Sequence, residues 1–324
     1  ENVAPVGVAY VDDSAQQSYE AMVNLLIPEV TQHEVFVADL FANNWWGIEG
    51  HHFAKHAIES ALWDVHAKRQ GESLASVLGG VTDVVEVGAV VGMHDTVDAV
   101  VDEVMQRVNE GYARVKIKIA LGHDAEVLAA VREAVGIEYA LQADANGAYS
   151  ASDIDLLCSF DSYALQFIEQ PFAAHDLDSH AQLSQRSATS VCLDESVMTT
   201  AQLLTALDLG ACDVVNIKPS RVGGIREAIA MHDLLVERGV DAWVGGMLET
   251  GIGRASCLAL ASMPGFTLTP DLSASARYFQ RDVTAPFVLD DGCLHVPQGK
   301  GIGVEPLEEV LAEKNVVIET VFEH

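Results

Sequence analysis

Three acidic side chains recur along the sequence at equal intervals. Asp144, Glu169 and Asp194 each stand at the end of a short apolar run, 25 residues apart, and no His or Cys stands at the same run ends. Carboxylates that share one small site repel one another unless a cation joins them. Oxygen ligands suit a hard ion such as Mg²⁺, with Mn²⁺ as the alternative. One carboxylate alone would more simply cap a helix or pair with a lysine, whereas three in phase predict a metal site.

Lysines occur in the same phase on both sides of the carboxylates. Lys118 precedes Asp144 by 26 residues, and Lys218 follows Asp194 by 24 residues. In the run RVKIKI, strand alternation puts Lys116 and Lys118 on one face. Amines beside a divalent ion suit removal of a proton next to a carboxylate, because the ion stabilises the charge that develops on oxygen. Lysines at a strand edge also discourage aggregation, but that role would not explain Lys218 or the phase.

A repeating unit must position these side chains. Eight strand-length apolar runs alternate with amphipathic helical patterns, at 84–92, 114–119, 139–146, 165–171, 190–196, 213–219, 241–247 and 266–272. Eight strands and seven helical segments predict an α/β fold, a (β/α)7β barrel of the TIM type, in which polar groups at the strand ends share one rim. The rival is an open doubly wound sheet, but no GxGxxG sequence stands at the first strand-to-helix turn.

The two ends of the chain lack this repeat. Residues 1–83 predict helices, at 14–30 and 51–70. The second helix has an apolar face formed by Phe53, Ala57, Ala61, Leu62 and Val65. The last residues predict a turn-rich segment with a final helix or strand. We therefore predict a mainly helical capping domain at 1–83, a catalytic barrel at 84–290 and a C-terminal segment at 291–324 that packs back on the capping domain.

Composition excludes several classes of protein. The chain has 324 residues, 49% of them hydrophobic, which is enough for a large core and argues against disorder. Its net charge of −30 disfavours nucleic acid and membrane surfaces as partners. The sequence has no run of eighteen apolar residues, its five cysteines are scattered, and we expect no signal peptide. These features predict a cytoplasmic protein with reduced thiols.

Several strings in the sequence carry a family resemblance. KIK, DAN, IEQP, LDES and NIKPSRVGG, in this order and spacing, are similar to the motifs of the enolase superfamily, muconate-lactonising branch. The segments AKHAIESALWDVHAKRQGESLASVLGG and GGMLETGIGRAS narrow the resemblance to the o-succinylbenzoate synthase / N-succinylamino acid racemase subgroup. The match extends over essentially the whole chain, and the resemblance implies a barrel with a smaller α+β capping domain.

The resemblance assigns roles to the strand-end residues. It implies that Mg²⁺ is bound by three ligands, Asp144, Glu169 and Asp194. Lys118 would be the base that takes the proton, and Lys116 would contact the substrate carboxylate beside it. Lys218 would act on the opposite face, either by moving a proton or by stabilising an enediolate through its charge.

Further residues take supporting roles in the same comparison. Asn146 and Glu195 would orient the metal ligands. Arg221, close after Lys218, would tune that amine by repulsion or simply be a surface arginine. The segment GGMLETGIG would approach the substrate through Gly246, Met247 and Glu249.

Two reactions begin with the same proton transfer at such a site. The resemblance implies Mg²⁺-dependent dehydration of 2-succinyl-6-hydroxy-2,4-cyclohexadiene-1-carboxylate to o-succinylbenzoate, in menaquinone biosynthesis. The alternative is racemisation of N-succinyl or other N-acylamino acids. A muconate cycloisomerase-like enzyme is less supported. So is a catalytically inactive binding barrel, because every lysine and carboxylate of the pattern is present.

The resemblance also sets expectations for partners and for the capping domain. It implies a small-molecule carboxylate as substrate and a homo-oligomeric assembly. Glu1 aligns with the end of the family's N-terminal three-stranded sheet. We therefore expect most of that sheet, and the specificity loop within it, to be absent from this chain.

Overall fold

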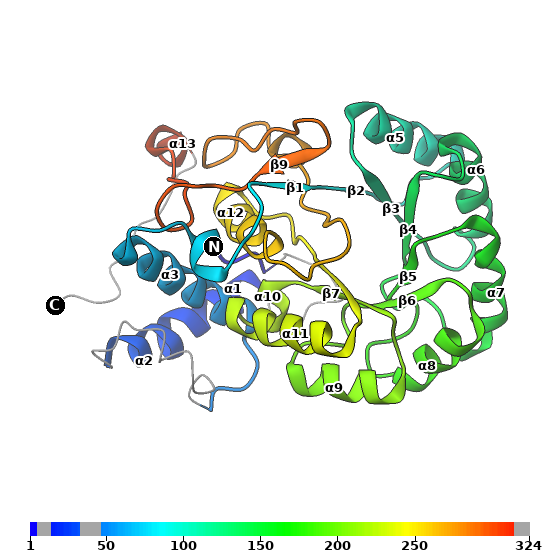
Figure 1. Cartoon of the computed structure of the whole chain (residues 1–324), viewed down its shortest axis with the longest axis horizontal. Helices are drawn as coiled ribbons and strands as arrows, with labels where there is room; N and C mark the ends of the chain where they lie inside the picture. The colour runs from blue at the N-terminus through cyan, green and yellow to red at the C-terminus, as the bar shows by residue number, and fades with distance from the viewer. Residues whose placement is uncertain (5–13, 33–46, 314–324) are drawn as a thin grey trace.

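Seven parallel strands form the centre of the molecule. The computed structural model describes residues 1–4, 14–32 and 47–313, and the end of the predicted C-terminal segment lies outside them. The strands follow one another in the sheet in chain order: β2 (Ala89–Val91), β3 (Arg114–Lys118), β4 (Ala140–Asp144), β5 (Phe167–Glu169), β6 (Ser190–Leu193), β7 (Val214–Ile217) and β8 (Asp241–Val244). Figure 1 shows this sheet curled, with helices along its outer side. The predicted barrel class is confirmed.

Helices connect successive strands, as the alternating pattern predicts. They are α5 (Val97–Glu110), α6 (Ala125–Val135), α7 (Ile154–Ser159), α8 (Leu177–Arg186), α9 (Thr200–Leu209), α10 (Pro219–Val222), α11 (Ile225–Arg238) and α12 (Gly251–Ala261). In α6, the side chain of Asp124 accepts from the first helical N–H, and Val127, Leu128 and Val131 form the buried stripe.

The prediction of a regular eighth strand at 266–272 is wrong. This segment has no strand assignment, although it lies between β8 and the start of β2. Thr267 donates its backbone N–H to Ala242, and Pro270 accepts from the backbone of Gly88 at 2.8 Å. A ladder cannot continue through Pro270 because proline has no N–H. An irregular segment therefore occupies the eighth position of the barrel.

The sequence predicts a single strand at 84–92, but the structure has two strands there. The first part, β1 (Val84–Glu86), pairs antiparallel with β9 (Cys293–His295), and only β2 joins the barrel. The chain changes direction at Gly88, where a Cβ atom would lie 2.4 Å from Nε of Arg114. Glycine at this position lets the buried Arg114 side chain pass close to the backbone.

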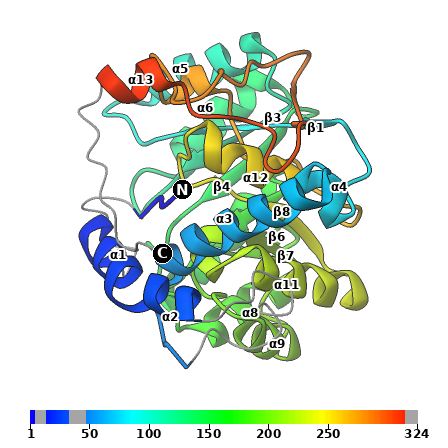
Figure 2. The same ribbon diagram turned by 90° about the vertical axis from the view of Figure 1, so that its left-hand side faces the viewer.

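Helices from the N-terminal part pack on one side of the barrel (Figure 2). A continuous helical stretch comprises α1 (Ala15–Ala21), the π-helical turn η1 (Met22–Leu26) and α2 (Ile27–Gln32), and α3 (His52–Gln70) is followed by α4 (Leu74–Leu78). The helices predicted at 14–30 and 51–70 are confirmed. The predicted apolar face of α3 is only partly right, because Ala61 and Val65 are exposed whereas Glu59 is buried.

The C-terminal segment lies against this helical part. Leu74 donates its backbone N–H to the Gly301 carbonyl at 2.6 Å, and Asp64 of α3 accepts from the backbone N–H of Ile302 at 2.8 Å. The last described helix is α13 (Glu308–Glu313). The domain boundaries themselves remain a prediction.

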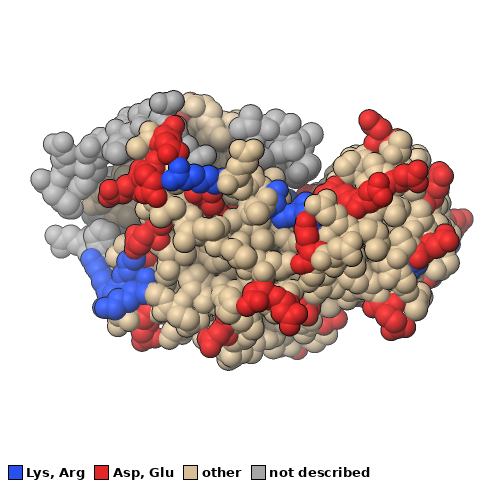
Figure 3. Space-filling view, turned by 90° about the horizontal axis from the view of Figure 1, so that it is seen from above, with Lys and Arg blue, Asp and Glu red and all other residues tan. Residues whose placement is uncertain are grey.

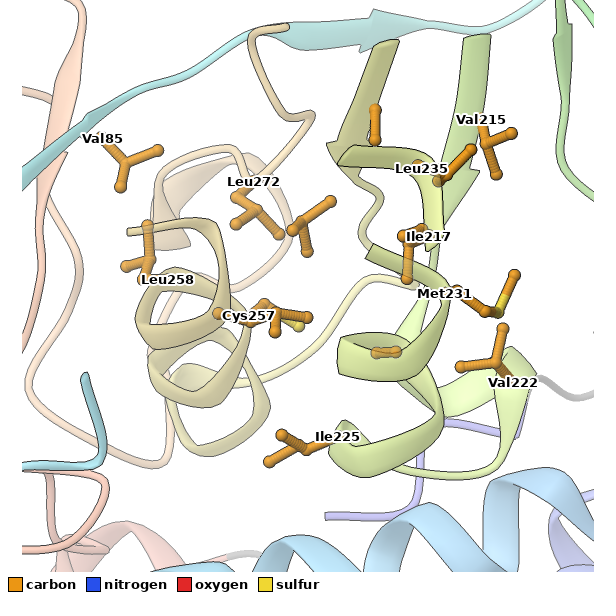
Figure 4. Packing of buried hydrophobic residues seen from close by; sticks show 14 of the residues in the cluster. Val85, Val215, Ile217, Val222, Ile225, Met231, Leu235, Cys257, Leu258 and Leu272 are labelled. Carbon is orange, nitrogen blue, oxygen red and sulfur yellow. The ribbon is translucent and has the colours of Figure 1, made fainter. Parts of the chain in front are cut away.

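Outward-facing strand residues build the core against the helices. Val215 and Ile217 of β7 lie in one buried cluster with Met231 and Leu235 of α11 and with Leu258 of α12 (Figure 4). Each fully buried aliphatic side chain of this kind contributes about 1.5–3 kcal/mol through apolar burial. Side chains alternate between the two faces of a strand, so the strand residues next to outward-facing ones such as Val215 and Ile217 face the barrel interior. This alternation orients the candidate site residues.

The surface reflects the acidic composition. More Asp and Glu than Lys and Arg side chains are visible on the face drawn in Figure 3. Among the described residues, no helix has both the length and the apolar character that a membrane span requires.

Candidate active site

The strand register places the predicted site residues at one end of the barrel. Lys118 is paired in register with Asp144, and Asp144 with Glu169, at the carboxyl ends of β3, β4 and β5. Asp194 and Lys218 directly follow β6 and β7. The carboxyl ends of parallel barrel strands meet at one rim. The structure therefore brings the predicted lysines and carboxylates onto neighbouring strands of the same rim.

Lys116 is the centre of a buried cluster of carboxylates. Its Nζ lies 2.7 Å from Oε2 of Glu169, 2.9 Å from Oδ2 of Asp271 and 3.4 Å from Oδ2 of Asp144. It also lies 4.8 Å from the centre of the Trp243 ring. Burial opposes the charged form of Lys116, but the carboxylates, Asp271 first, outweigh it and raise its pKa. Lys116 is therefore a fixed positive charge in the barrel interior.

Lys118 is more accessible than its neighbour, with 27% of its side chain exposed. Its Nζ contacts Oδ2 of Asp144 and Oδ1 of Asn146, each at 2.5 Å. Asn146 in turn donates to Oε1 of Glu195 at 2.8 Å. Burial, followed by the charge of Asp144, raises the pKa of Glu195. Asn146 thus connects Lys118 with Glu195.

Lys218 lies in a second ion-pair group around Asp194. Its Nζ is 2.7 Å from Oδ2 of Asp194, whose Oδ1 contacts the Arg221 guanidinium. The backbone N–H of Asp194 donates to Oε1 of Gln170 at 3.0 Å. Arg221 is buried and approaches the sulfur of Met247 at 4.0 Å. Arg221 is therefore part of the site wall rather than a surface arginine.

The loop after β8 closes one side of the site. The backbone N–H of Gly246 donates to Oδ1 of Asp271 at 2.6 Å, and that of Met247 donates to Oε1 of Glu249 at 2.7 Å. Burial raises the pKa of Glu249 to about 6, although Arg254 works in the opposite direction. The loop conformation is thus fixed by two buried carboxylates, Asp271 and Glu249.

A cavity of about 700 Å³ opens between these groups. Its wall includes Lys116, Lys118, Lys218, Asn146, Gly246, Met247, Glu249, Arg254, Asp271, Val90, Tyr278, Phe279 and residues 1–4. Cavities of this size hold small organic ligands. Several cations and a few apolar side chains suit an anion with a carbon skeleton.

The three predicted metal ligands already have cationic partners in this structure. Lysines contact all three, and within the described ranges no group of three His, Cys, Asp or Glu side chains is arranged to hold a metal ion. The donor chemistry nevertheless fits a hard divalent ion, because the set is entirely carboxylate and fully buried. Binding would require the ammonium groups to move from the shared oxygens. Metal ligation by Asp144, Glu169 and Asp194 remains a prediction.

Sequence reasoning missed several residues of this site. Asp271 is not among the predicted site residues, yet it contacts Lys116 and the loop after β8. Asn216 donates to Oε1 of Glu169 at 2.7 Å and could have been found, because it stands two residues before Lys218 on the same strand face. Arg254 carries no such signal, because it follows the loop on a helix.

Family models match most of the chain. Residues 99–310 match the model described as "Enolase C-terminal domain-like". Residues 4–79 match the model "Mandelate racemase / muconate lactonizing enzyme, N-terminal domain".

Individual relatives are similar over nearly the whole chain. An N-succinylamino acid racemase from Amycolatopsis sp is 42% identical over 313 residues, which are 97% of this chain and 85% of the relative. An o-succinylbenzoate synthase from Bacillus subtilis (strain 168) is 40% identical, over 93% of this chain and 81% of the relative. The crystal structure of an enolase superfamily member from Enterococcus faecalis V583 has a TM-score of 0.90 and 37% identity, over 96% of this chain and 84% of that chain.

Proposed function

The chain belongs to the enolase superfamily, in its mandelate racemase / muconate lactonizing enzyme branch, and from this premise we propose that it is an o-succinylbenzoate synthase. The proposed reaction is the Mg²⁺-dependent dehydration of 2-succinyl-6-hydroxy-2,4-cyclohexadiene-1-carboxylate. The substrate class, a small-molecule carboxylate, is supported by the lysines in the cavity wall.

One observation carries this proposal. Lys118 and Lys218 line the same cavity, and each lies beside a buried carboxylate. Lys118 is the last residue of β3 and Lys218 directly follows β7, and these strands are four positions apart in the sheet order. In a ring of eight positions, four steps correspond to opposite sides. Two amines on opposite sides of a cavity suit proton transfer at a carbon atom held between them.

The chain's own residues account for the proton movements. Neutral Lys118 takes the proton from the carbon next to the substrate carboxylate, and the C–H electron pair moves toward that carboxylate. The adjacent C–O bond then breaks, and the Lys118 ammonium gives its proton to the departing hydroxyl, so that water leaves. Lys116 and Lys218 supply positive charge on the two sides while the carboxylate gains electron density. Asn146 fixes the position of Lys118 through its 2.5 Å contact.

Asp144, Glu169 and Asp194 are the residues that would hold Mg²⁺. The ion would neutralise the negative charge that develops on the substrate carboxylate oxygens. Their burial, with no more than 1% exposed, supports a role for a cation at this place, since buried carboxylates require compensating charge. The ammonium groups compensate that charge in the present arrangement.

Racemisation of N-succinylamino acids is the second candidate. It is supported by the relative from Amycolatopsis sp and by the position of Lys218, which would return a proton to the opposite face of the carbon. Relatives with both names are about equally similar, at 42% and 40% identity. One site can serve both reactions, because both begin with the same proton transfer.

The dehydration can be followed directly. We would measure the loss of ultraviolet absorbance of 2-succinyl-6-hydroxy-2,4-cyclohexadiene-1-carboxylate with Mg²⁺, and again after adding EDTA. Fast loss that EDTA stops would support the synthase. A folded protein that binds Mg²⁺ but leaves the absorbance unchanged would exclude the synthase and leave the racemase.

A further inference from the structure

Among the described residues, one buried cation in the cavity wall has no carboxylate partner. Arg254 lies in the first turn of α12 with 1% of its surface exposed, and it lines the same cavity as Lys118 and Lys218. Its Nη2 donates to the Glu249 carbonyl at 2.7 Å, and its guanidinium lies 5.5 Å from the centre of the Tyr278 ring. Within the described part of the chain, its Nε is buried without a hydrogen-bond partner. A guanidinium in this state requires an acceptor.

Two other arginines near the cavity have carboxylate partners. Arg221 contacts Asp194, and Arg277, which also lies beside the Tyr278 ring, is 3.1 Å from Glu103. Buried guanidinium groups in proteins are normally satisfied in this way. Nε of Arg277 also lacks a hydrogen-bond partner, so what distinguishes Arg254 from both is that it has no carboxylate within ion-pair distance among the described residues.

The anionic side chains close to Arg254 already have other partners. The carboxylate of Glu1 accepts from the backbone N–H of Thr250 at 2.9 Å and from its hydroxyl at 2.6 Å, and so caps the start of α12. Oε1 of Glu249 accepts from Met247 at 2.7 Å. Neither of these carboxylates forms an ion pair with Arg254, so a molecule in the cavity is a suitable source of the acceptor that its Nε lacks.

We propose that Arg254 binds the distal carboxylate of a dicarboxylate substrate, the terminal carboxylate of its succinyl group. This inference rests on the proposed function, because both candidate substrates carry a succinyl group in addition to the carboxylate beside the reacting carbon. The lysines attract the near carboxylate, and Arg254 selects the far one. Val90, Tyr278 and Phe279 line the same cavity and suit the methylene groups of the tail.

Two ligands that differ only at the end of the tail test this role. N-Succinylphenylalanine ends in a carboxylate, whereas N-butyrylphenylalanine has a tail of similar length without charge. We would measure the Kd of each by calorimetry with Mg²⁺ present, which does not depend on turnover. The wild type should bind the succinyl compound about 10- to 100-fold more tightly, as expected for a charge-assisted hydrogen bond. Equal Kd values in the wild type would overturn the proposal, even if no variant folds.

Matched variants assign the preference to one side chain. Arg254→Gln should reduce the ratio of the two Kd values to about threefold or less, and Arg254→Lys should retain part of it. Arg277→Gln makes the same substitution at the other arginine beside Tyr278 and should leave the ratio unchanged. Thermal unfolding would show that each variant is folded. A ratio in Arg254→Gln equal to that of the wild type would overturn the proposal.

Failure of this inference can be distinguished from failure of the proposed function. Exchange of the α-proton with D₂O reports the chemistry, and the Kd ratio reports tail recognition. If both compounds exchange their α-proton and the ratio of their Kd values is one, the proposed function is retained and the role of Arg254 is overturned. A large ratio without exchange or dehydration would retain Arg254 as a carboxylate ligand and overturn the function.

Discussion

Each predicted metal ligand shares its carboxylate with a cation that also faces the cavity. Asp194 contacts both Lys218 and Arg221, and Asp144 contacts Lys116 and Lys118. Burial and then the two lysines act on Asp144, and the lysines prevail and lower its pKa. The same oxygens thus contact the amines in this structure, and in our proposal they would also hold the metal ion.

Substitution of Asp194 tests this shared role. Asp194→Asn removes a negative charge but keeps the side-chain shape, so we expect Mg²⁺ binding to weaken at least about tenfold. Calorimetric titration with Mg²⁺ would measure the effect, with urea unfolding as a check of the fold. Asp208→Asn is the control, because Asp208 is 61% exposed and pairs with Arg238 on the surface. Unchanged affinity in Asp194→Asn would remove Asp194 from the ligand set.

The raised pKa of Glu249 predicts how the stability of the protein depends on pH. Its pKa is about 6 in the fold, above its ordinary value of 4.5. Between these values the folded chain holds a proton that the unfolded chain has lost, so this residue lowers stability as pH rises. We expect Glu249→Gln to gain about 1 kcal/mol of unfolding free energy relative to the wild type between pH 5.0 and pH 7.5.

The measurement is urea unfolding of both proteins at the two pH values. The glutamine oxygen can still accept the 2.7 Å hydrogen bond from Met247, so the comparison isolates the charge. An unchanged difference between variant and wild type across this range would show that Glu249 has an ordinary pKa.

Residues that lie at strand ends were predictable, whereas those that depend on loops were not. The intervals of 24–26 residues identify Lys118, Asp144, Glu169, Asp194 and Lys218 because one repeat separates neighbouring strands. Arg254 and Tyr278 enter the cavity through the path of the chain after β8, which no periodicity describes. Glu249 was predicted at the site, but its burial could not be derived from the sequence.

At the scale of elements, one carboxylate joins the capping helices to the barrel. Oε1 of Glu59, in α3, accepts from the backbone N–H of Arg226 at 2.8 Å and from Trp63 at 3.1 Å. Gly224 is the N-cap residue of α11, and it has no side chain to cap the helix. Glu59 therefore accepts a hydrogen bond from a backbone N–H in the first turn of α11, although it lies outside the barrel. The helix dipole also favours a negative charge at this end of the helix. The residue that Glu59 contacts, Arg226, follows shortly after α10 in the sequence, and α10 carries Arg221.

Gly224 makes that contact possible. A Cβ atom at this position would lie 1.9 Å from Oε2 of Glu59 and displace the carboxylate. We expect Gly224→Ala to lose about 1–3 kcal/mol of unfolding free energy, measured by urea unfolding. Gly210→Ala is the control, because Gly210 also has a positive φ but a Cβ atom there meets nothing within 4 Å. A Gly224→Ala protein as stable as Gly210→Ala would contradict the role of Glu59 as a cap.

The errors in predicting elements have physical causes. The buried face of α3 contains Glu59 and His56, so the pattern of hydrophobic residues alone predicts the wrong face. The apolar segment 266–272 has strand composition, but Pro270 prevents a continuous ladder. The split of 84–92 at Gly88 depends on pairing with β9, which lies about two hundred residues away in the sequence. Local sequence patterns carry no information about contacts between residues so far apart in the sequence.

At the scale of the whole molecule, the acidic surface contrasts with a cavity wall in which several cations stand among the carboxylates. The chain carries 18 Lys and Arg against 48 Asp and Glu, yet Lys116, Lys118, Lys218 and Arg254 all line one cavity. A net charge of −30 repels an anionic ligand at long range, so binding depends on cations within the site. The division into a capping domain at 1–83, a barrel at 84–290 and a packing segment at 291–324 remains our proposal.

The central claim is that Lys118 and Lys218 act on opposite faces of one carbon atom. The most direct measurement is ¹H NMR of α-proton exchange in D₂O, using L- and D-N-succinylphenylalanine with the wild type, Lys118→Ala and Lys218→Ala. The exposed Lys300→Ala serves as the control. We predict that the wild type and control exchange both enantiomers, and that each cavity variant loses exchange of a different enantiomer by at least about 100-fold. Loss of the same enantiomer in both variants, or wild-type exchange of both enantiomers in either, would contradict the account.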